Sequence, residues 1–337
     1  MKVQTKPTLT IIMPTYNKKQ YIEQALDSIF MQKTTYNYEI IVADDASNDG
    51  TLDIVHKYDL KYPNKIKILE SKINQKLFKN IIRAYAITKT DYFCVLDPDD
   101  YWIDEEKIQK ALDFLEANKE FTIYSANTNM LYNDGTKRAW VIAKQKETNF
   151  KDYLQGKALL GHTSSCVFRN VIFKNGLPSK LTTLENSSNE VSYRGDSFRN
   201  IIHIHGEGGG GKAFFTPEID SIYRITQEGI WQSLDNSKQL MMNCAFHRDM
   251  WLFFDKEYIE LLRTSYQLYK KILQSNIFLE NHDEFILNMN KLYDLGKSYQ
   301  PYISQLDISK KPNTLKYKLF LSCYKFLHKK LAKKGYV

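Results

Sequence analysis

Short apolar runs alternate with longer segments of helical spacing through the first third of the chain. The runs 9–13, 38–43, 65–69 and 92–96 are rich in β-branched residues and end at polar or turn residues. Runs of this kind are typical of strands that are buried on both faces of a sheet. The pattern therefore predicts four strands of a mostly parallel sheet.

Helical stripes separate these runs. Residues 18–32 carry apolar side chains at i, i+3 and i+4, and residues 51–61 and 77–88 repeat the pattern more weakly. Residues 104–118 place acids in a first turn and continue with an apolar face. Alternating strands and helices predict a doubly wound, Rossmann-like α/β fold with helices flanking the sheet.

The rest of the chain changes character near residue 235. Residues 121–235 mix short strands with loops, whereas helical patterns dominate from about 238 onward. We expect one α/β domain over 1–235, with halves at about 8–120 and 121–235, followed by a helical C-terminal region over 236–337.

Composition narrows the setting in which this fold works. The net charge of +8 over 337 residues suits an anionic partner. No apolar run reaches the roughly 18 residues of a membrane-spanning helix, and the start does not resemble a signal peptide. The four cysteines are scattered without CxxC spacing, which favours free thiols over a zinc site. We expect a cytoplasmic protein.

The C-terminal tail has a distinct composition. Residues 314–337 hold seven lysines and no acid among regularly spaced apolar side chains. Such a segment suits an interfacial helix on an anionic membrane, and a helix packed on the domain with a solvated basic face explains it equally well. The helical third leaves three roles open: a homodimer contact, an acceptor-binding lid or a peripheral membrane anchor.

Polar clusters follow three of the predicted strands. They are "PTYN" (14–17), "DDASNDGT" (44–51) and "DPDD" (97–100). Ligands of open α/β sheets bind at the carboxyl ends of the strands. Three carboxylates in four positions need a cation, and Mg²⁺ or Mn²⁺ held by one or two carboxylates plus substrate phosphates fits that need. The alternative is a helix N-cap at Asp100, which needs only one aspartate.

Four ordered segments carry a family resemblance. Residues 11–32, 38–51, 91–102 and 105–118 resemble the nucleotide-sugar-binding half of a family 2 glycosyltransferase with the GT-A fold, closely over about 8–135 and loosely to about 235. The resemblance implies an inverting enzyme that moves a sugar from a nucleoside diphosphate sugar, with UDP as the first choice, to a glycan or lipid-linked hydroxyl acceptor.

The resemblance assigns donor contacts by position. Pro14 and Tyr16 line the base pocket, with Asn17 in the same motif, and Asp45 accepts a hydrogen bond from the base beside Asp44.

The same resemblance assigns the metal and loop residues. Asp99 is the first choice as direct ligand of the divalent metal, Asp97 binds the metal or the ribose, and Asp100 is a further ligand or orients the helix that follows. Lys79 and Asn80 match a basic-residue-plus-Asn pair. The Gly that is usual just after "NQ" is Lys76 here.

The second half supplies the base and a covering loop. Asp196 occupies the place of the catalytic carboxylate that takes a proton from the acceptor hydroxyl, with Glu190 and Glu185 as competitors. Arg224 is expected to face the diphosphate and Trp231 to cover the donor. The alternatives are purely structural roles: Arg224 on the surface and Trp231 in the core. Thr226 stands where a His is common, and His162 or water could compensate.

Residues 206–213, "GEGGGGKA", match the letters of a phosphate-binding P-loop. A P-loop follows a buried strand, opens a helix and supplies Ser or Thr, and Ala213 with the residues after it does not fit. We expect instead a mobile loop near the acceptor site.

Two other functions remain open. A catalytically inactive scaffold of the same fold would bind a nucleotide or a glycan. A sugar nucleotidyltransferase would need a Gly-rich basic signature after the first strand, which residues 14–21 lack. Nucleic-acid binding is disfavoured because the basic residues are dispersed and no recognition motif is present.

Overall fold

The computed structural model describes residues 6–181, 195–226, 236–274 and 298–306, together with the single residues Leu234 and Gly296. The chain forms two compact units, Met1–Ser233 and Leu234–Val337. The predicted membrane-binding tail at 314–337 lies outside the described residues, as do Glu185, Glu190 and Trp231.

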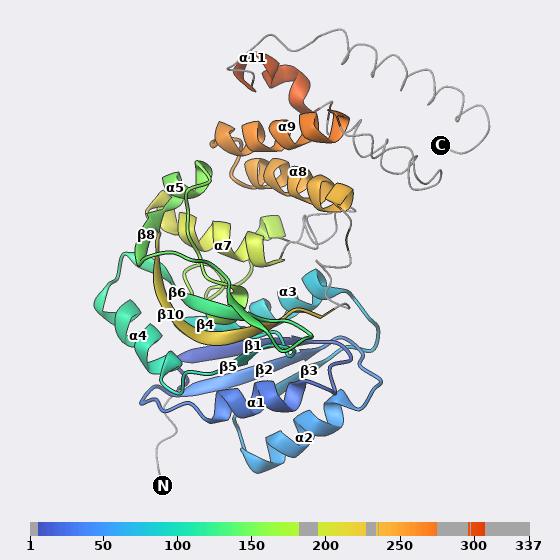
Figure 1. Cartoon of the computed structure of the whole chain (residues 1–337), viewed down its shortest axis with the longest axis vertical. Helices are drawn as coiled ribbons and strands as arrows, with labels where there is room; N and C mark the ends of the chain where they lie inside the picture. Colours follow the sequence, from blue (N-terminus) through green and yellow to red (C-terminus); the bar gives the residue numbers. More distant parts are fainter. Residues whose placement is uncertain are drawn as a thin grey trace, which may run out of the picture. The chain divides into compact units, whose positions relative to one another are not determined.

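One sheet organises the first unit (Figure 1). Its main path runs β3-β2-β1-β4-β9-β6-β10-β5; β7 pairs with β6 and β8 pairs with β10. Along this path only β9 and β5 run against the direction of the others, so the central sheet is mostly parallel, as the sequence predicts. The strands are β1 (Leu9–Thr15), β2 (Tyr38–Asp44), β3 (Ile66–Glu70), β4 (Tyr92–Val95), β5 (Tyr101–Trp102), β6 (Phe121–Leu131), β7 (Lys137–Ala139), β8 (Lys146–Asn149), β9 (Cys166–Arg169) and β10 (Lys212–Arg224).

Helices cover both faces of this sheet (Figure 1). One face packs against the apolar stripes of α1, α2 and α4, with Leu26, Val55 and Leu112 in a single buried cluster with Ile11 of β1. Cys94 of β4 lies opposite Ile11 and belongs to the same cluster. Because side chains alternate between the two faces along a strand, the neighbouring Phe93 points to the other face, where it contacts Tyr85 of α3. The helices are α1 (Ile22–Phe30), α2 (Thr51–Lys61), α3 (Leu77–Ile87), α4 (Lys107–Ala117), α5 (Phe150–Leu154) and α7 (Gly195–His205), with short 3₁₀ turns η1 (Thr163–Ser165) and η3 (Glu207–Gly209).

The parallel register brings the three polar clusters to one edge of the sheet. Thr15 at the end of β1 lies opposite Asp44 at the end of β2, and Ile12 lies opposite Val95 at the end of β4. The segments that follow these strands therefore leave the sheet side by side. This convergence is what the sequence pattern predicted.

The glycine-rich loop, expected near Asp196 and the acceptor site, lies at the other edge of the sheet, away from Asp196. Helix α7 continues for nine residues beyond Asp196, about 14 Å, before the loop begins. The loop then leads into β10, where Lys212 pairs with Phe121 at the start of β6. Because Lys212 opens a strand and not a helix, the P-loop alternative is excluded.

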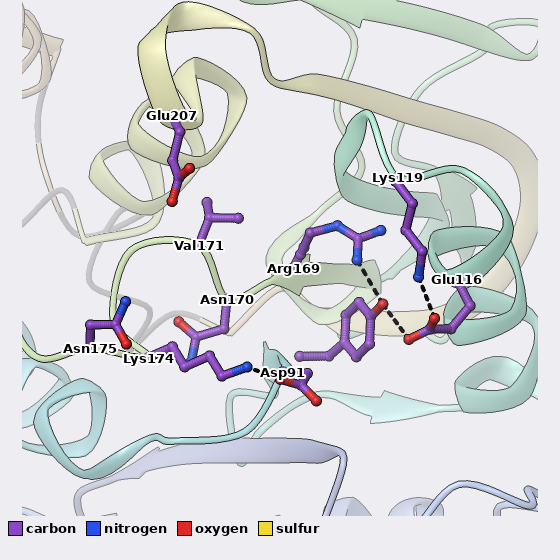
Figure 2. Close-up of a pocket in the computed structure, with 10 residues that line it drawn as sticks. Asp91, Glu116, Lys119, Arg169, Asn170, Val171, Lys174, Asn175 and Glu207 are labelled. Carbon is purple, nitrogen blue, oxygen red and sulfur yellow. Dashed lines mark hydrogen bonds and ion pairs between the residues drawn. The ribbon is translucent and has the colours of Figure 1, made fainter.

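A cavity of about 410 Å³ lies beside this loop, between Glu207 and the start of β4 (Figure 2). Its charged groups are matched within the protein. Lys119 pairs with Glu116 at 2.5 Å, Tyr92 Oη donates to the same carboxylate at 2.6 Å, and Arg169 donates to Tyr92 Oη at 2.8 Å. These interactions neutralise the cavity wall without a ligand.

The second unit is helical where the structure describes it. It contains α8 (Asn236–Phe253), α9 (Ile259–Gln274), η5 (Gln300–Tyr302) and α11 (Ile303–Leu306). Buried Ser265 of α9 donates to the carbonyl of Cys244 in α8 at 2.6 Å and contacts Tyr299 Oη at 2.6 Å. Among the described helices of the whole chain, none has the length and apolar character needed to cross a membrane. Cys94, Cys166 and Cys244 are free and buried.

A buried ion pair ties α4 to β10 beneath the carboxyl edge. Lys107 Nζ lies 2.5 Å from Asp220 Oδ2, and both side chains are almost fully buried. Lys107 also donates to the carbonyl of Ser165 at 2.9 Å, so it fixes η1 as well. Burial raises the pKa of Asp220, and the charge and hydrogen bond of Lys107 work against that rise.

We predict that Lys107→Met lowers the free energy of unfolding by about 3–5 kcal/mol, because it leaves a buried carboxylate unpaired. The double variant Lys107→Met/Asp220→Leu should recover most of that loss. Lys119→Met, which breaks an exposed pair, should cost no more than about 1 kcal/mol. Urea denaturation of the four proteins checks this; a double variant as unstable as the single one would contradict it.

Candidate active site

The "DPDD" segment forms a tight turn between β4 and β5. The Asp100 amide donates to the carbonyl of Asp97 at 2.9 Å, and β5 begins at the next residue, Tyr101. Helix α4 starts only at Lys107. The N-cap alternative for Asp100 is therefore excluded, because the residue that precedes α4 is Glu106.

Positive charge near this turn comes from three residues outside it: Lys18, Arg199 and Arg224. Lys18 Nζ donates to Asp99 Oδ2 at 2.6 Å. Burial works to lower the pKa of Lys18, but the charge and hydrogen bond of Asp99 raise it overall. Burial, followed by the charge of Asp99, raises the pKa of Asp97 to about 7, while Arg199 and Lys18 act in the opposite direction. The cations present do not fully compensate the carboxylates.

Asp100 is the most enclosed of the three, with 2% of its surface exposed. Its Oδ1 accepts a hydrogen bond from the Arg224 amide at 3.1 Å, whereas its buried Oδ2 has no hydrogen-bond partner. That oxygen lies 3.6 Å from His162 Nδ1. Burial lowers the pKa of His162 to about 4, so the imidazole is neutral at pH 7 and brings no charge to Asp100. Burial also raises the pKa of Asp100 well above its usual value.

Arg224, which is expected to face the diphosphate, lies at this turn, and its guanidinium is engaged by the protein. It donates to the backbone carbonyl of Asp99 at 3.0 Å and to the side chain of Gln24. The guanidinium also lies 4.7 Å from the ring centroid of Tyr101 and 5.2 Å from that of Tyr21. Arg224 therefore fixes the turn from the β10 side.

The expected base pocket lies where β1 and β2 end. Pro14 is buried in β1, and Tyr16 is 44% exposed beside it. The Asn17 side chain accepts from the Asn48 amide at 2.9 Å, which joins the two clusters. Buried Asp44 accepts from the Ser47 amide at 2.9 Å through one oxygen, and its other oxygen is buried without a partner.

Asp45 holds the loop that precedes α3. Its two carboxylate oxygens accept from the amides of Gln75 and Lys76 at 2.7 and 2.9 Å. Lys76 adopts φ 72° and ψ 160°, a conformation that is essentially restricted to glycine. The loop thus has a backbone conformation typical of glycine although Lys76 stands where the family resemblance leads us to expect a glycine. Asn80 is buried and donates to the carbonyl of Ala43 at 2.7 Å, and Lys79 beside it is partly exposed.

Asp196 lies in the first turn of α7, where the helix dipole favours a negative charge. Its side chain is exposed, and its charge acts on Asp97 and His162. Arg199, one turn further along, is 1% exposed; it donates to Tyr85 Oη and to Thr163 Oγ1 at 3.1 Å each. α7 therefore brings an exposed carboxylate and a buried guanidinium to the same edge.

Two of these cations were missed in the sequence. Arg199 follows Asp196 at i+3 on one helix face, a spacing that could have identified it. Lys18 carries no such signal, because its partner Asp99 is 81 residues away. The competing carboxylates Glu185 and Glu190, and the covering Trp231, lie outside the described residues.

The family model described as "Glycosyl transferase family 2" matches residues 10–177. This half of the chain carries the strand ends that converge at one edge of the sheet. Residues 10–177 belong to glycosyl transferase family 2. The fold is the GT-A type that goes with it.

Curated relatives agree with this family. A protein of Mycobacterium tuberculosis without assigned function is 27% identical over 229 residues, which are 67% of this chain and 61% of that protein. The dTDP-rhamnosyl transferase RfbG of Shigella flexneri is 38% identical over 146 residues, 42% of this chain and 48% of RfbG. The chain thus spans less than two thirds of the length of these relatives.

A solved structure resembles the fold over nearly the whole chain. S. aureus TarS 1–349, crystallised in complex with UDP, superposes with a TM-score of 0.61 at 16% identity. The match covers 97% of this chain and 92% of that one. At this identity the likeness shows the fold.

We predict that Lys76→Gly raises the free energy of unfolding by about 1 kcal/mol, because relief of a backbone strain of about 1–3 kcal/mol exceeds the added entropy of the unfolded chain. Lys72→Gly is the matched control: it is an exposed residue of the same loop without positive φ, and it should be neutral or destabilising. Urea denaturation compares the two, and equal losses of stability would contradict the strain at Lys76.

Proposed function

We propose that this protein is an inverting glycosyltransferase that moves a sugar from a nucleoside diphosphate sugar, a UDP-sugar in the first instance, to a hydroxyl of a growing surface glycan or lipid-linked acceptor. The observation that carries the proposal is the crowding of Asp97, Asp99 and Asp100 at the end of β4, with the exposed carboxylate of Asp196 within electrostatic reach of Asp97. Family membership and the presence of UDP in the TarS complex support it.

The residues at the turn fit a divalent metal bound together with substrate. Among the described residues, no three His, Cys, Asp or Glu side chains converge closely enough to hold a metal by themselves. None of the residues that the structure describes donates a hydrogen bond to the Asp97 carboxylate, and of them only Lys18 donates one to the Asp99 carboxylate. Two such carboxylates completed by diphosphate oxygens match the usual coordination of Mg²⁺ or Mn²⁺.

In this proposal Asp99 binds the metal directly, Asp97 binds it or the ribose, and Asp100 orients the turn through Arg224. The metal would neutralise the charge on the leaving diphosphate. Lys18, already at the turn, adds a second positive charge beside that group. Pro14, Tyr16, Asn17, Asp44 and Asp45 form the nucleotide side of the pocket, with Lys79 and Asn80 next to it.

Asp196 takes the proton in the proposed reaction. An inverting transfer needs one base to accept the proton of the acceptor hydroxyl as that oxygen attacks the anomeric carbon. Asp196 lies in the first turn of α7, where the helix dipole favours a negative charge, and its side chain is exposed to an incoming acceptor. No covalent intermediate is required, so Asp196 and a stabilised leaving group are sufficient.

We further propose that the enzyme works at the cytoplasmic face of a membrane, held there by the basic tail at 314–337. The composition of the tail supports this: seven lysines without an acid attract an anionic lipid surface. A homodimer contact through the helical C-terminal region is the second proposal for that part of the chain.

We predict that Asp196→Asn lowers kcat for transfer or donor hydrolysis by about 10²–10⁴-fold, because it removes the base, and leaves nucleotide binding intact. Asp99→Asn should abolish the manganese-dependent stabilisation by UDP, which is about 2.7 kcal/mol at a hundredfold excess over Kd. Thermal-shift titrations with UDP, GDP, CMP and dTDP, each with and without Mn²⁺, measure binding; release of UDP from UDP-sugars measures activity.

Asp91→Asn is the control, since Asp91 pairs with Lys174 at the opposite edge of the sheet and should change neither measurement. Absence of a shift with every nucleotide would contradict the proposed donor site and favour the scaffold. Full activity in Asp196→Asn would show that another carboxylate is the catalytic base, and Glu190 and Glu185 would be the next candidates.

A further inference from the structure

Three aromatic rings from distant parts of the chain form a cluster beside the "DPDD" turn. His162 stacks on Tyr223 with ring centroids 4.1 Å apart. The Trp140 ring meets His162 at 5.1 Å and Tyr223 at 6.0 Å, both edge to face. His162 precedes η1, Tyr223 lies in β10, and Trp140 follows β7 directly.

Trp140 is the exposed member of this cluster. Its side chain is 43% exposed, although its segment is fixed to the sheet. The Trp140 amide donates to the carbonyl of Thr128 in β6 at 2.7 Å. Asn127 secures the next residue from both sides, because its amide group donates to the Val141 carbonyl at 2.8 Å and accepts from the Val141 amide at 3.3 Å. A large indole is therefore presented to solvent in a defined place.

This cluster is continuous with the carboxylates of the proposed reaction. His162 Nδ1 lies 3.6 Å from Asp100 Oδ2, and Tyr223 directly precedes Arg224, whose amide donates to Asp100 Oδ1 at 3.1 Å. On the other side, the charge of Asp196 acts on His162. The aromatic cluster thus adjoins the turn, and the proposed base lies within electrostatic reach of His162.

The order of the strands in the sheet indicates which substrate would contact these rings. The proposed nucleotide contacts come from β1 and β2, on one side of β4, whereas the aromatic rings come from β6–β7, η1 and β10 on the other side. In an inverting displacement the acceptor oxygen attacks opposite to the leaving diphosphate. A donor whose base lies at β1 and β2 therefore points its anomeric carbon toward the half of the sheet that holds Trp140.

We propose that Trp140, which contacts His162 and Tyr223 edge to face, is the stacking platform for a sugar ring of the acceptor. Pyranose rings carry an apolar C–H face that packs on aromatic surfaces, and binding sites combine such surfaces with a few polar groups. Here Asp196 is the polar group that would meet the acceptor hydroxyl. This inference rests on the proposed function, since it names the acceptor side of that same site.

The experiment measures binding of simple glycosides to the full-length protein. The probes are the methyl glycosides of glucose, galactose, N-acetylglucosamine and rhamnose, observed by saturation-transfer NMR with UDP and diamagnetic Mg²⁺ present. The variants are Trp140→Ala, Trp140→Phe and Ile142→Ala; Ile142 is 98% exposed two residues further along and serves as the matched control. Thermal-shift titration with UDP is carried out on each protein in parallel.

We expect at least one glycoside to bind the native protein, with affinity about tenfold weaker in Trp140→Ala and largely retained in Trp140→Phe and Ile142→Ala. The stabilisation by UDP should be the same in all four proteins. Equal glycoside binding in Trp140→Ala would overturn the platform, as would the absence of glycoside binding in a protein that binds UDP.

The remaining outcomes separate this inference from the proposed function. A loss of the UDP shift in Trp140→Ala would overturn the acceptor assignment and place the indole on the donor side. A protein that binds a glycoside through Trp140 but no nucleoside diphosphate would contradict the glycosyltransferase and leave the sugar platform standing. Trp140→Phe keeps the test decisive if Trp140→Ala fails to fold.

Discussion

The constraint on which this structure depends is the concentration of negative charge in a four-residue turn. Asp97, Asp99 and Asp100 follow a buried strand, and burial raises the pKa of Asp97 to about 7 and that of Asp100 well above its usual value. Nearby cations relieve this only in part, since Lys18 contacts Asp99 and Arg199 acts at longer range. The uncompensated negative charge destabilises the turn in the free protein, so binding a cation there would stabilise it strongly.

The surrounding structure holds the turn in place despite the repulsion among its carboxylates. Arg224 holds it from β10 through its backbone amide and its guanidinium. Beneath it, the buried pair of Lys107 and Asp220 joins α4, β10 and the segment that carries His162. On the proposed nucleotide side, Asp45 maintains a strained backbone at Lys76 with two hydrogen bonds. These contacts preorganise the proposed site in the free protein, which is the arrangement that electrostatic catalysis would require.

Much of this fold could be predicted from the sequence because its signals are local. The apolar runs and helical stripes of residues 9–118 locate the first strands and helices closely, and parallel pairing then forces the polar ends together. Lys18 and Trp140 escaped prediction because the residues they contact are far away in the chain, whereas the i+3 spacing from Asp196 carried a local signal for Arg199. The position of the glycine loop does not follow from its closeness in sequence to Asp196, because α7 carries the chain from Asp196 to the other edge of the sheet.

The most direct test of the central claim is the affinity of the protein for Mn²⁺, measured by electron paramagnetic resonance of the free ion with and without UDP. Because the two ligands share the site, each should raise the affinity for the other by the same factor. We predict that UDP strengthens Mn²⁺ binding about 10- to 100-fold in the native protein and has no effect in Asp97→Asn/Asp99→Asn. Mn²⁺ binding that is unchanged by UDP, or unchanged in the double variant, would contradict the account.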